Sequence, residues 1–432
     1  MFDLVLRNAN LPGGRKNLDI AIADGRIVAV EMGVQGKAAQ DIDATGRLVT
    51  SPFVDSHIHL DSTLSLGLPR MNASGTLLEG IALWGELKPH LTQEAIYERA
   101  RKLCLWSAAR GTLAIRSHVD VCDERLLAVE ALVQLKKDLA AWIDIQLVAF
   151  PQDGFFRSRG AEANLRKALG MGVEVVGGIP HFERTQEDGR LSVQALMRIA
   201  ADAGLMVDMH CDESDDPLSR HVETLAAETL HYGMAGRVAG SHLTSMHSMD
   251  NYYVSKLIPL IAESGLSAIA NPLINITLQG RHDSYPKRRG MTRVKELLAA
   301  DVPVAFGHDC VMDPWYSLGS HDMLEVAAMG LHVGQLTSLQ EIDACFKAVT
   351  STPANILKLD AYGVNPGCWG DLVVLQAEDE MEAIRLRAER LYVFRRGKLL
   401  AQSAPRESQV WFGSDRQNVE FTRQNLNQLR SA

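Results

Sequence analysis

The chain has 432 residues, 46% of them hydrophobic and 22% charged, and its formal net charge is −9. This composition is ordinary for a globular protein, and the length allows several domains or one large barrel with an appendage. The acidic balance argues against a nucleic-acid partner, which would favour a basic face. No apolar run approaches the ~20 residues needed to cross a bilayer, so we expect a soluble protein with no membrane partner.

The cysteines are scattered and include no CxxC pair. They are Cys104, Cys122, Cys211, Cys310, Cys345 and Cys368. Such spacing is typical of reduced thiols rather than of a disulfide framework. The N-terminus also lacks the layout of a signal peptide, so we expect a cytoplasmic location.

Both ends of the chain are predicted to be rich in strands. Residues 3–7, 18–22 and 26–30 alternate in polarity, and Asp24-Gly25 marks a hairpin. Strand-like segments return at 370–375 and 391–400, with a turn at Arg396-Gly397. We predict that residues 1–50 and 365–432 form one small β-sandwich domain; the alternative is two unrelated decorations.

Residues 51–364 alternate between helix and strand. Counting from Leu48, the predicted strands continue at 113–120, 143–150, 173–178, 206–210, 237–242, 267–271 and 302–309. Amphipathic helices are predicted between them, for example at 91–109 with Thr92 as N-cap, 161–169 and 193–203. Eight βα units of this length predict a (β/α)8 barrel, whose function lies at the carboxyl ends of its strands.

Polar residues end almost every one of these strands, and two histidines end the first. In an extended chain, side chains at i and i+2 share a face, so His57 and His59 should point the same way. His210 ends the fifth strand and Asp309 the eighth. Taken singly, His210 could be a core histidine and Asp309 a helix N-cap. Jointly they predict a site for one divalent metal ion, Fe²⁺ or Zn²⁺, that lowers the pKa of a bound water from ~15.7 toward ~7.

Two further residues are candidates for proton transfer. Glu213 follows His210 by three residues, so it can reach over the metal without binding it. The alternative is a solvated loop carboxylate. His242 ends the sixth strand and could stabilise developing charge; the alternative is a structural histidine near His247.

The motifs that carry these residues resemble the amidohydrolase superfamily and, more narrowly, the bacterial cytosine deaminases. They are His57-x-His59, HCDE at 210–213, SHLTSMH at 241–247 and GHD at 307–309. The narrower likeness is carried by VAFPQDG at 148–154, NPLINI at 271–276, LQGR at 278–281, YPKRRG at 285–290 and DPWY at 313–316. Binuclear members usually carry a lysine after strand four, where Gly177-Gly178 stands here, so the resemblance implies a mononuclear site.

The resemblance also implies a role for each candidate. Asp309 would bind the metal and take a proton from the attacking water, Glu213 would protonate the ring nitrogen, and His242 would hold the attacking oxygen. Gln152 would hydrogen-bond the pyrimidine edge, for which a neutral amide is suited. The backbone near Leu77 and the ring of Trp315 would line the pocket that holds the base. The implied reaction is hydrolytic deamination of a free nucleobase.

One position departs from the family pattern. Cytosine deaminases usually have a second aspartate directly after the metal aspartate, and here that residue is Cys310. The change could be drift at a tolerant site. A thiol behaves as a small hydrophobe, however, so we predict that a methyl group at C5 is tolerated and that 5-methylcytosine is deaminated to thymine.

Other readings remain open. The same ligands would serve a deaminase of isoguanine, creatinine or a triazine, or a hydrolase that opens a cyclic amide. A non-catalytic assembly protein is disfavoured because such relatives generally lose metal ligands. We also expect a homo-oligomer, since large barrels of this type often assemble.

Overall fold

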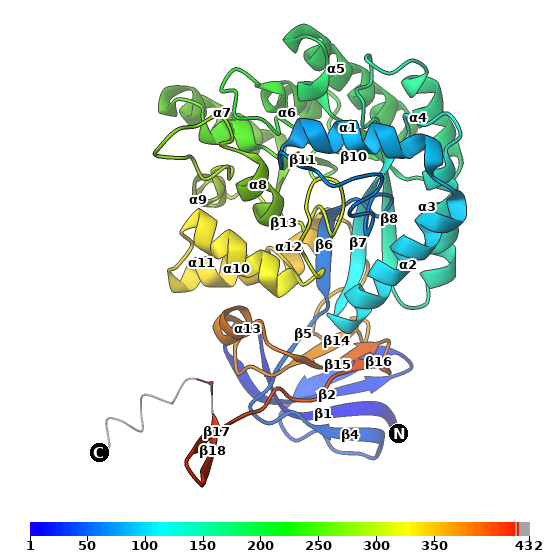
Figure 1. The fold of residues 1–432 in the computed structure, drawn as a ribbon. Coiled ribbons are helices and arrows are strands. Elements are labelled where there is room, and N and C mark those ends of the chain that lie inside the picture. Colours follow the sequence, from blue (N-terminus) through cyan, green and yellow to red (C-terminus); the bar gives the residue numbers. More distant parts are fainter. Residues whose placement is uncertain (420, 423–432) are drawn as a thin grey trace.

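A computed structural model gives the fold and describes residues 1–419, 421 and 422. A barrel of parallel strands stands above a small sheet built from both ends of the chain (Figure 1). The barrel strands are β6 (Phe53–Ile58), β7 (Thr112–Asp120), β8 (Asp144–Phe150), β9 (Val175–Gly178), β10 (Met206–Cys211), β11 (Val238–His242), β12 (Ser267–Ala270) and β13 (Val304–Phe306). Each pairs in parallel with the next. This confirms the predicted (β/α)8 fold.

The first and last strands meet at the metal-binding motifs. The backbone N–H of His59 donates to the carbonyl of Asp309 at 3.0 Å, and the N–H of Asp309 donates to the carbonyl of His57 at 2.7 Å. These bonds join the ends of β6 and β13, so residues about 250 positions apart in the chain become neighbours.

Helices connect the barrel strands or follow the last of them. They are α1 (Leu77–Leu87), α2 (Gln93–Ala109), α3 (Leu127–Leu139), α4 (Ala161–Gly170), α5 (Gln186–Ala203), α6 (His221–His231), α7 (Asn251–Ser264), α8 (Pro272–Leu278), α9 (Val294–Ala299), α10 (Met323–Gly334), α11 (Leu339–Lys347) and α12 (Ser351–Ile356). In α2, Thr92 accepts from the N–H of Ala95, while Ile96, Ala100 and Leu103 form the buried face. Helix α1 crosses the barrel end farthest from the small sheet (Figure 1).

The small sheet combines the two ends of the chain, as predicted. Its strands are β1 (Phe2–Leu11), β2 (Arg15–Ala23), β3 (Arg26–Glu31), β4 (Ala38–Asp43), β5 (Leu48–Thr50), β14 (Leu372–Leu375), β15 (Arg390–Arg395) and β16 (Lys398–Gln402), with α13 (Glu380–Leu386) between β14 and β15. The order is β16-β15-β14-β5-β1-β2-β3, with β4 beside β1. Leu4, Leu6 and Ile20 from one end share a core with Val374 and Phe394 from the other.

One detail of the sequence prediction was wrong. The run at Leu48 is not the first barrel strand, because β5 pairs with β1 and β14 and the barrel begins at Phe53. Pro52 lies between the two strands and has no N–H to continue a ladder. Residues 408–419, for which no strands were predicted, form a separate hairpin: among the described residues, β17 (Ser408–Phe412) and β18 (Asp415–Val419) pair only with each other.

The limits 1–50, 51–364 and 365–432 remain a prediction. The helix-compatible run 423–428 lies outside the described residues. Within the part of the chain that is described, no helix is both long and apolar enough to span a membrane.

Candidate active site

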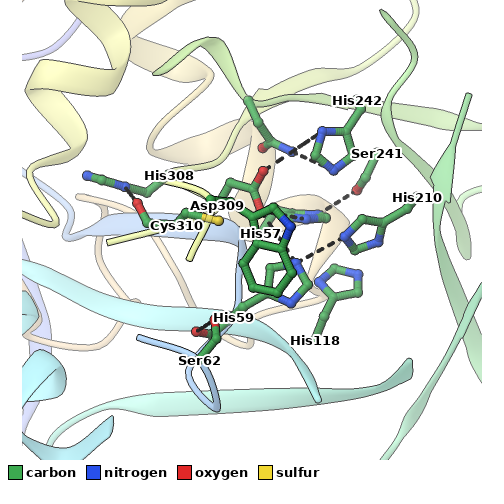
Figure 2. Close-up of polar contacts among 12 residues, drawn as sticks. His57, His59, Ser62, His118, His210, Ser241, His242, His308, Asp309 and Cys310 are labelled. Atoms are coloured by element: carbon green, nitrogen blue, oxygen red, sulfur yellow. Dashed lines mark hydrogen bonds and ion pairs between the residues drawn. The ribbon is translucent and has the colours of Figure 1, made fainter. Parts of the chain in front are cut away.

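The predicted metal ligands converge at the carboxyl ends of the barrel strands. His57, His59, His210 and Asp309 each offer one ligand atom, and these four atoms lie within 4.8 Å of one another. Figure 2 shows the side chains pointing toward one another. Asp309 Oδ1 lies 3.4 Å from the Nε2 atoms of both His57 and His59.

The donor set fits a divalent cation. Nε2 of His59 and Nε2 of His210 lie only 3.0 Å apart, so their ring nitrogens aim at a common point. Burial lowers the pKa of His59 to about 3 and that of His210 well below its ordinary value, which keeps both imidazoles neutral as metal binding requires. Burial alone would raise the pKa of Asp309, but the surrounding histidines hold it below its ordinary value. Three imidazoles and one carboxylate suit Zn²⁺ or Fe²⁺.

Glu213 and His242 lie beside this group. Glu213 Oε1 is 3.5 Å from His242 Nδ1, and Asp309 Oδ2 is 3.9 Å from the same nitrogen. Burial and the charge of Asp309 raise the pKa of Glu213 well above its ordinary value, which favours the protonated form of this carboxyl. An ionised Asp309 and a protonated Glu213 can serve as acceptor and donor in one reaction.

The amides of helix α8 and its N-cap orient His242. The side-chain N–H of Asn275 lies 3.0 Å from His242 Nδ1, and that of Asn271 lies 3.3 Å from the same atom. Because an amide N–H only donates, the donation from Asn275 leaves the ring proton on Nε2. His242 also has a φ of +70°, and Asp309 one of +69°, a left-handed backbone that non-glycine residues adopt at a cost.

A small pocket of ≈30 Å³ opens onto the ligand group. Gln152, Leu77, Cys310 and Trp315 all line it, together with Ile81, Ile179, Ile274 and Leu278. Helix α1 contributes Leu77 and Ile81, so the segment between β6 and α2 forms one wall. Trp315 packs against this helix where Gly80 has no side chain: a Cβ there would lie 2.3 Å from Trp315 Cδ1.

Cys310 is 3% exposed and sits among acidic groups. Burial raises the pKa of its thiol well above 9, and the carboxyls of Asp309, Asp313 and Glu213 add to this shift. The thiol is therefore neutral at physiological pH. Asp313 in turn accepts the backbone N–H groups of Trp315 and Tyr316, at 2.9 and 3.0 Å, which fixes the loop that carries the pocket wall.

Sequence reasoning missed several residues around the site. The apolar lining residues other than Leu77 and Trp315 gave no signal, because a residue that lines a cleft has the same apolar character as one in the core. Asn271 and Asn275 lay inside a quoted motif, yet their contact with His242 needed coordinates. His118, Asp208 and Ser241 lie beneath the ligand group, and only the alternation of buried polar residues within strands could have indicated them.

Comparisons with known proteins agree with this fold and site. Residues 40–401 match the profile of the Amidohydrolase family. The chain is 29% identical over 408 residues to N-isopropylammelide isopropyl amidohydrolase of Pseudomonas sp. (strain ADP), covering 93% of this chain and 98% of that protein. It is 28% identical over 419 residues to pterin deaminase of Rhizobium rhizogenes, covering 93% of this chain and 94% of that protein.

Solved structures extend the likeness. 5-Methylcytosine deaminase from Klebsiella pneumoniae, liganded with 5-fluorocytosine, superposes with a TM-score of 0.90 and 41% identity over 93% of this chain and 98% of that one. N-isopropylammelide isopropylaminohydrolase from Burkholderia multivorans superposes with a TM-score of 0.82 and 26% identity over 93% of this chain and 99% of that one.

The chain belongs to the amidohydrolase family. It is an enzyme of the deaminase and hydrolase type that acts on a small molecule. The family is metal-dependent, and the His/Asp group described above could hold the ion.

Proposed function

We propose that this enzyme is a metal-dependent deaminase of free aminopyrimidine bases that converts cytosine and 5-methylcytosine to uracil and thymine with release of ammonia. The observation that carries the proposal is one small pocket shared by the metal-ligand group, Glu213, Gln152 and an uncharged Cys310. The likeness to 5-methylcytosine deaminase over nearly the whole chain supports it.

The metal ion would be held by His57, His59, His210 and Asp309. When bound, it supplies a water of lowered pKa and a Lewis acid beside the substrate. The chain's own side chains then have to orient the base, exclude bulk water and move protons.

Proton transfer follows from the two carboxyls. Asp309 accepts a proton from the attacking water as oxygen adds to C4, and Glu213 donates its proton to the adjacent ring nitrogen N3. Glu213 then takes the proton of the new hydroxyl while Asp309 gives its proton to the amino group, which leaves as ammonia. Both carboxyls return to their starting states, and His242 contacts the attacking oxygen throughout.

Gln152 and Cys310 would select the substrate. The Gln152 amide offers a donor and an acceptor, which match the carbonyl and ring N–H of a pyrimidine without placing a charge in the pocket. Cys310 would face C5, where a neutral thiol tolerates a methyl group.

An ammonia-release assay tests the proposal. The purified protein, loaded with Zn²⁺ or Fe²⁺, is supplied with cytosine, 5-methylcytosine, isoguanine, creatinine, an aminotriazine and pterin. We expect ammonia and an intact uracil or thymine ring from the pyrimidines, and ammonia release that is about 10²–10⁴-fold slower with Glu213→Gln. Turnover of another heterocycle without either pyrimidine, or opening of the ring, would contradict the proposal.

A homo-oligomeric state, a cytoplasmic location and a single metal ion per chain remain part of this proposal. Light scattering, fractionation of the host cell and metal analysis of the purified protein test them in turn.

A further inference from the structure

A chain of buried polar groups runs from the metal-ligand group into the barrel. His57 Nδ1 lies 2.8 Å from Ser241 Oγ, and Ser241 Oγ lies 2.7 Å from Asp208 Oδ1. Arg116 donates to the other oxygen, Asp208 Oδ2, at 2.9 Å. All four side chains are 0–1% exposed, and they come from β6, β11, β10 and β7. Figure 2 shows the contact between His57 and Ser241.

The direction of each hydrogen bond follows from the donors available. Asp208 forms a buried ion pair with the guanidinium of Arg116, whose nitrogens only donate, so the Asp208 carboxylate accepts. Ser241 therefore uses its single proton to donate to Asp208. Its oxygen can then only accept from His57, which places the imidazole proton on Nδ1.

That proton leaves the lone pair of His57 on Nε2. This atom has no hydrogen-bond partner among the described residues and lies 3.4 Å from Asp309 Oδ1, inside the ligand group. A bare lone pair facing a carboxylate oxygen is unfavourable unless a cation lies near both.

We propose that Arg116, Asp208 and Ser241 are positioning residues that hold His57 in the Nδ1-protonated tautomer, with its Nε2 lone pair aimed at the metal. The inference rests on the proposed metal site and extends it to three residues that touch neither ion nor substrate. Outer partners of this kind orient a ligand and raise its basicity.

The same contacts argue against a second ion in this region. His57, His118 and Asp208 also have ligand atoms within 4.8 Å of one another. Both oxygens of Asp208 are already engaged, however, by Ser241 and by the guanidinium of Arg116. A cation here would face that fixed positive charge, so the group serves to orient His57.

Two separate measurements, of metal affinity and of the His57 tautomer, test whether Arg116, Asp208 and Ser241 position His57. Ser241→Ala removes the acceptor, and Ser241→Thr keeps a hydroxyl. Ser245→Ala is the matched control, because Ser245 is buried in the segment that follows β11 and its Oγ has no partner within the described part of the chain. Zn²⁺ affinity is measured by competition with a chelator, and the His57 tautomer by ¹⁵N NMR of the metal-free protein.

We expect Ser241→Ala to weaken Zn²⁺ binding about 10- to 100-fold, with Ser241→Thr recovering most of the loss and Ser245→Ala unchanged. The His57 Nδ1–H signal should be present in wild type and diminished in Ser241→Ala. A Ser241→Ala protein that loses thermal stability but keeps the wild-type Zn²⁺ affinity and the wild-type His57 tautomer would overturn the proposed positioning role. A wild-type protein that shows the Nδ1–H signal but binds no metal would instead overturn the proposed function.

Discussion

Replacing Cys310 by aspartate should make the enzyme discriminate against a 5-methyl group. The Cys310 side chain is 3% exposed and lines the pocket, and burial together with the surrounding carboxyls keeps its thiol neutral. A carboxylate at this position would keep water near C5 and impose a desolvation penalty on a methyl group there. One methyl in a pocket is typically worth ~1–3 kcal/mol, which corresponds to a change of about 5- to 150-fold in relative rate.

The assay is the ratio of kcat/KM for 5-methylcytosine to kcat/KM for cytosine. We expect Cys310→Asp to lower this ratio by about 5- to 150-fold, chiefly through 5-methylcytosine. Cys310→Ser is the matched variant, because it is similar in size and uncharged, so it should shift the ratio far less. If Cys310→Asp deaminates cytosine but leaves the ratio unchanged, the side chain does not face C5 and the reasoning fails.

Three further predictions concern the proton donor Glu213, the pocket wall at Gly80 and the contact between His221 and Asp212. Because Glu213 must carry a proton and its pKa is raised, kcat/KM should fall as pH rises through that pKa, and Glu213→Gln should lose about 10²–10⁴-fold. Gly80→Ala should displace Trp315 and lower kcat/KM for both pyrimidines about 10²-fold. His221 donates to Asp212 at 2.7 Å, and although burial opposes the charge, Asp212 raises its pKa. The folded state thus binds a proton on His221 more tightly than the unfolded state does. We expect His221→Gln to lower the free energy of unfolding by about 1.5–3 kcal/mol. This loss should be largest below pH 6.5 and shrink as pH rises.

Matched variants separate these effects from general damage. Asp216→Asn alters an exposed carboxylate in the same loop as Glu213 and should keep the wild-type pH profile. Gly85→Ala lies in the same helix as Gly80, where an added Cβ meets nothing within 4 Å, and should keep wild-type kcat/KM. For His221→Gln, denaturant unfolding at pH 5.5 and pH 9 is compared with wild type. A loss of equal size at both values would refute the assigned charge.

The order of elements along the chain could be predicted because each is encoded locally. Apolar periodicity and capping residues such as Thr92 set the barrel helices and strands, and Asp24-Gly25 set a hairpin. The assignment of Leu48 to the barrel failed because an apolar run does not record which sheet it joins. That choice depends on partners in β1 and β14, the latter more than 300 residues away.

The candidate active site, too, was predictable from the sequence only in part. The sequence by itself determined which residues are able to bind a metal, since His57 and His59 share a face and His210 and Asp309 end later strands. Only the tertiary structure decided that their ligand atoms lie within 4.8 Å, that Ser241 and Asp208 stand behind His57, and that Asn275 orients His242. The physical reason is that ring closure of the barrel fixes neighbours across the sheet, and hydrogen-bond direction depends on those neighbours rather than on adjacent positions in the chain.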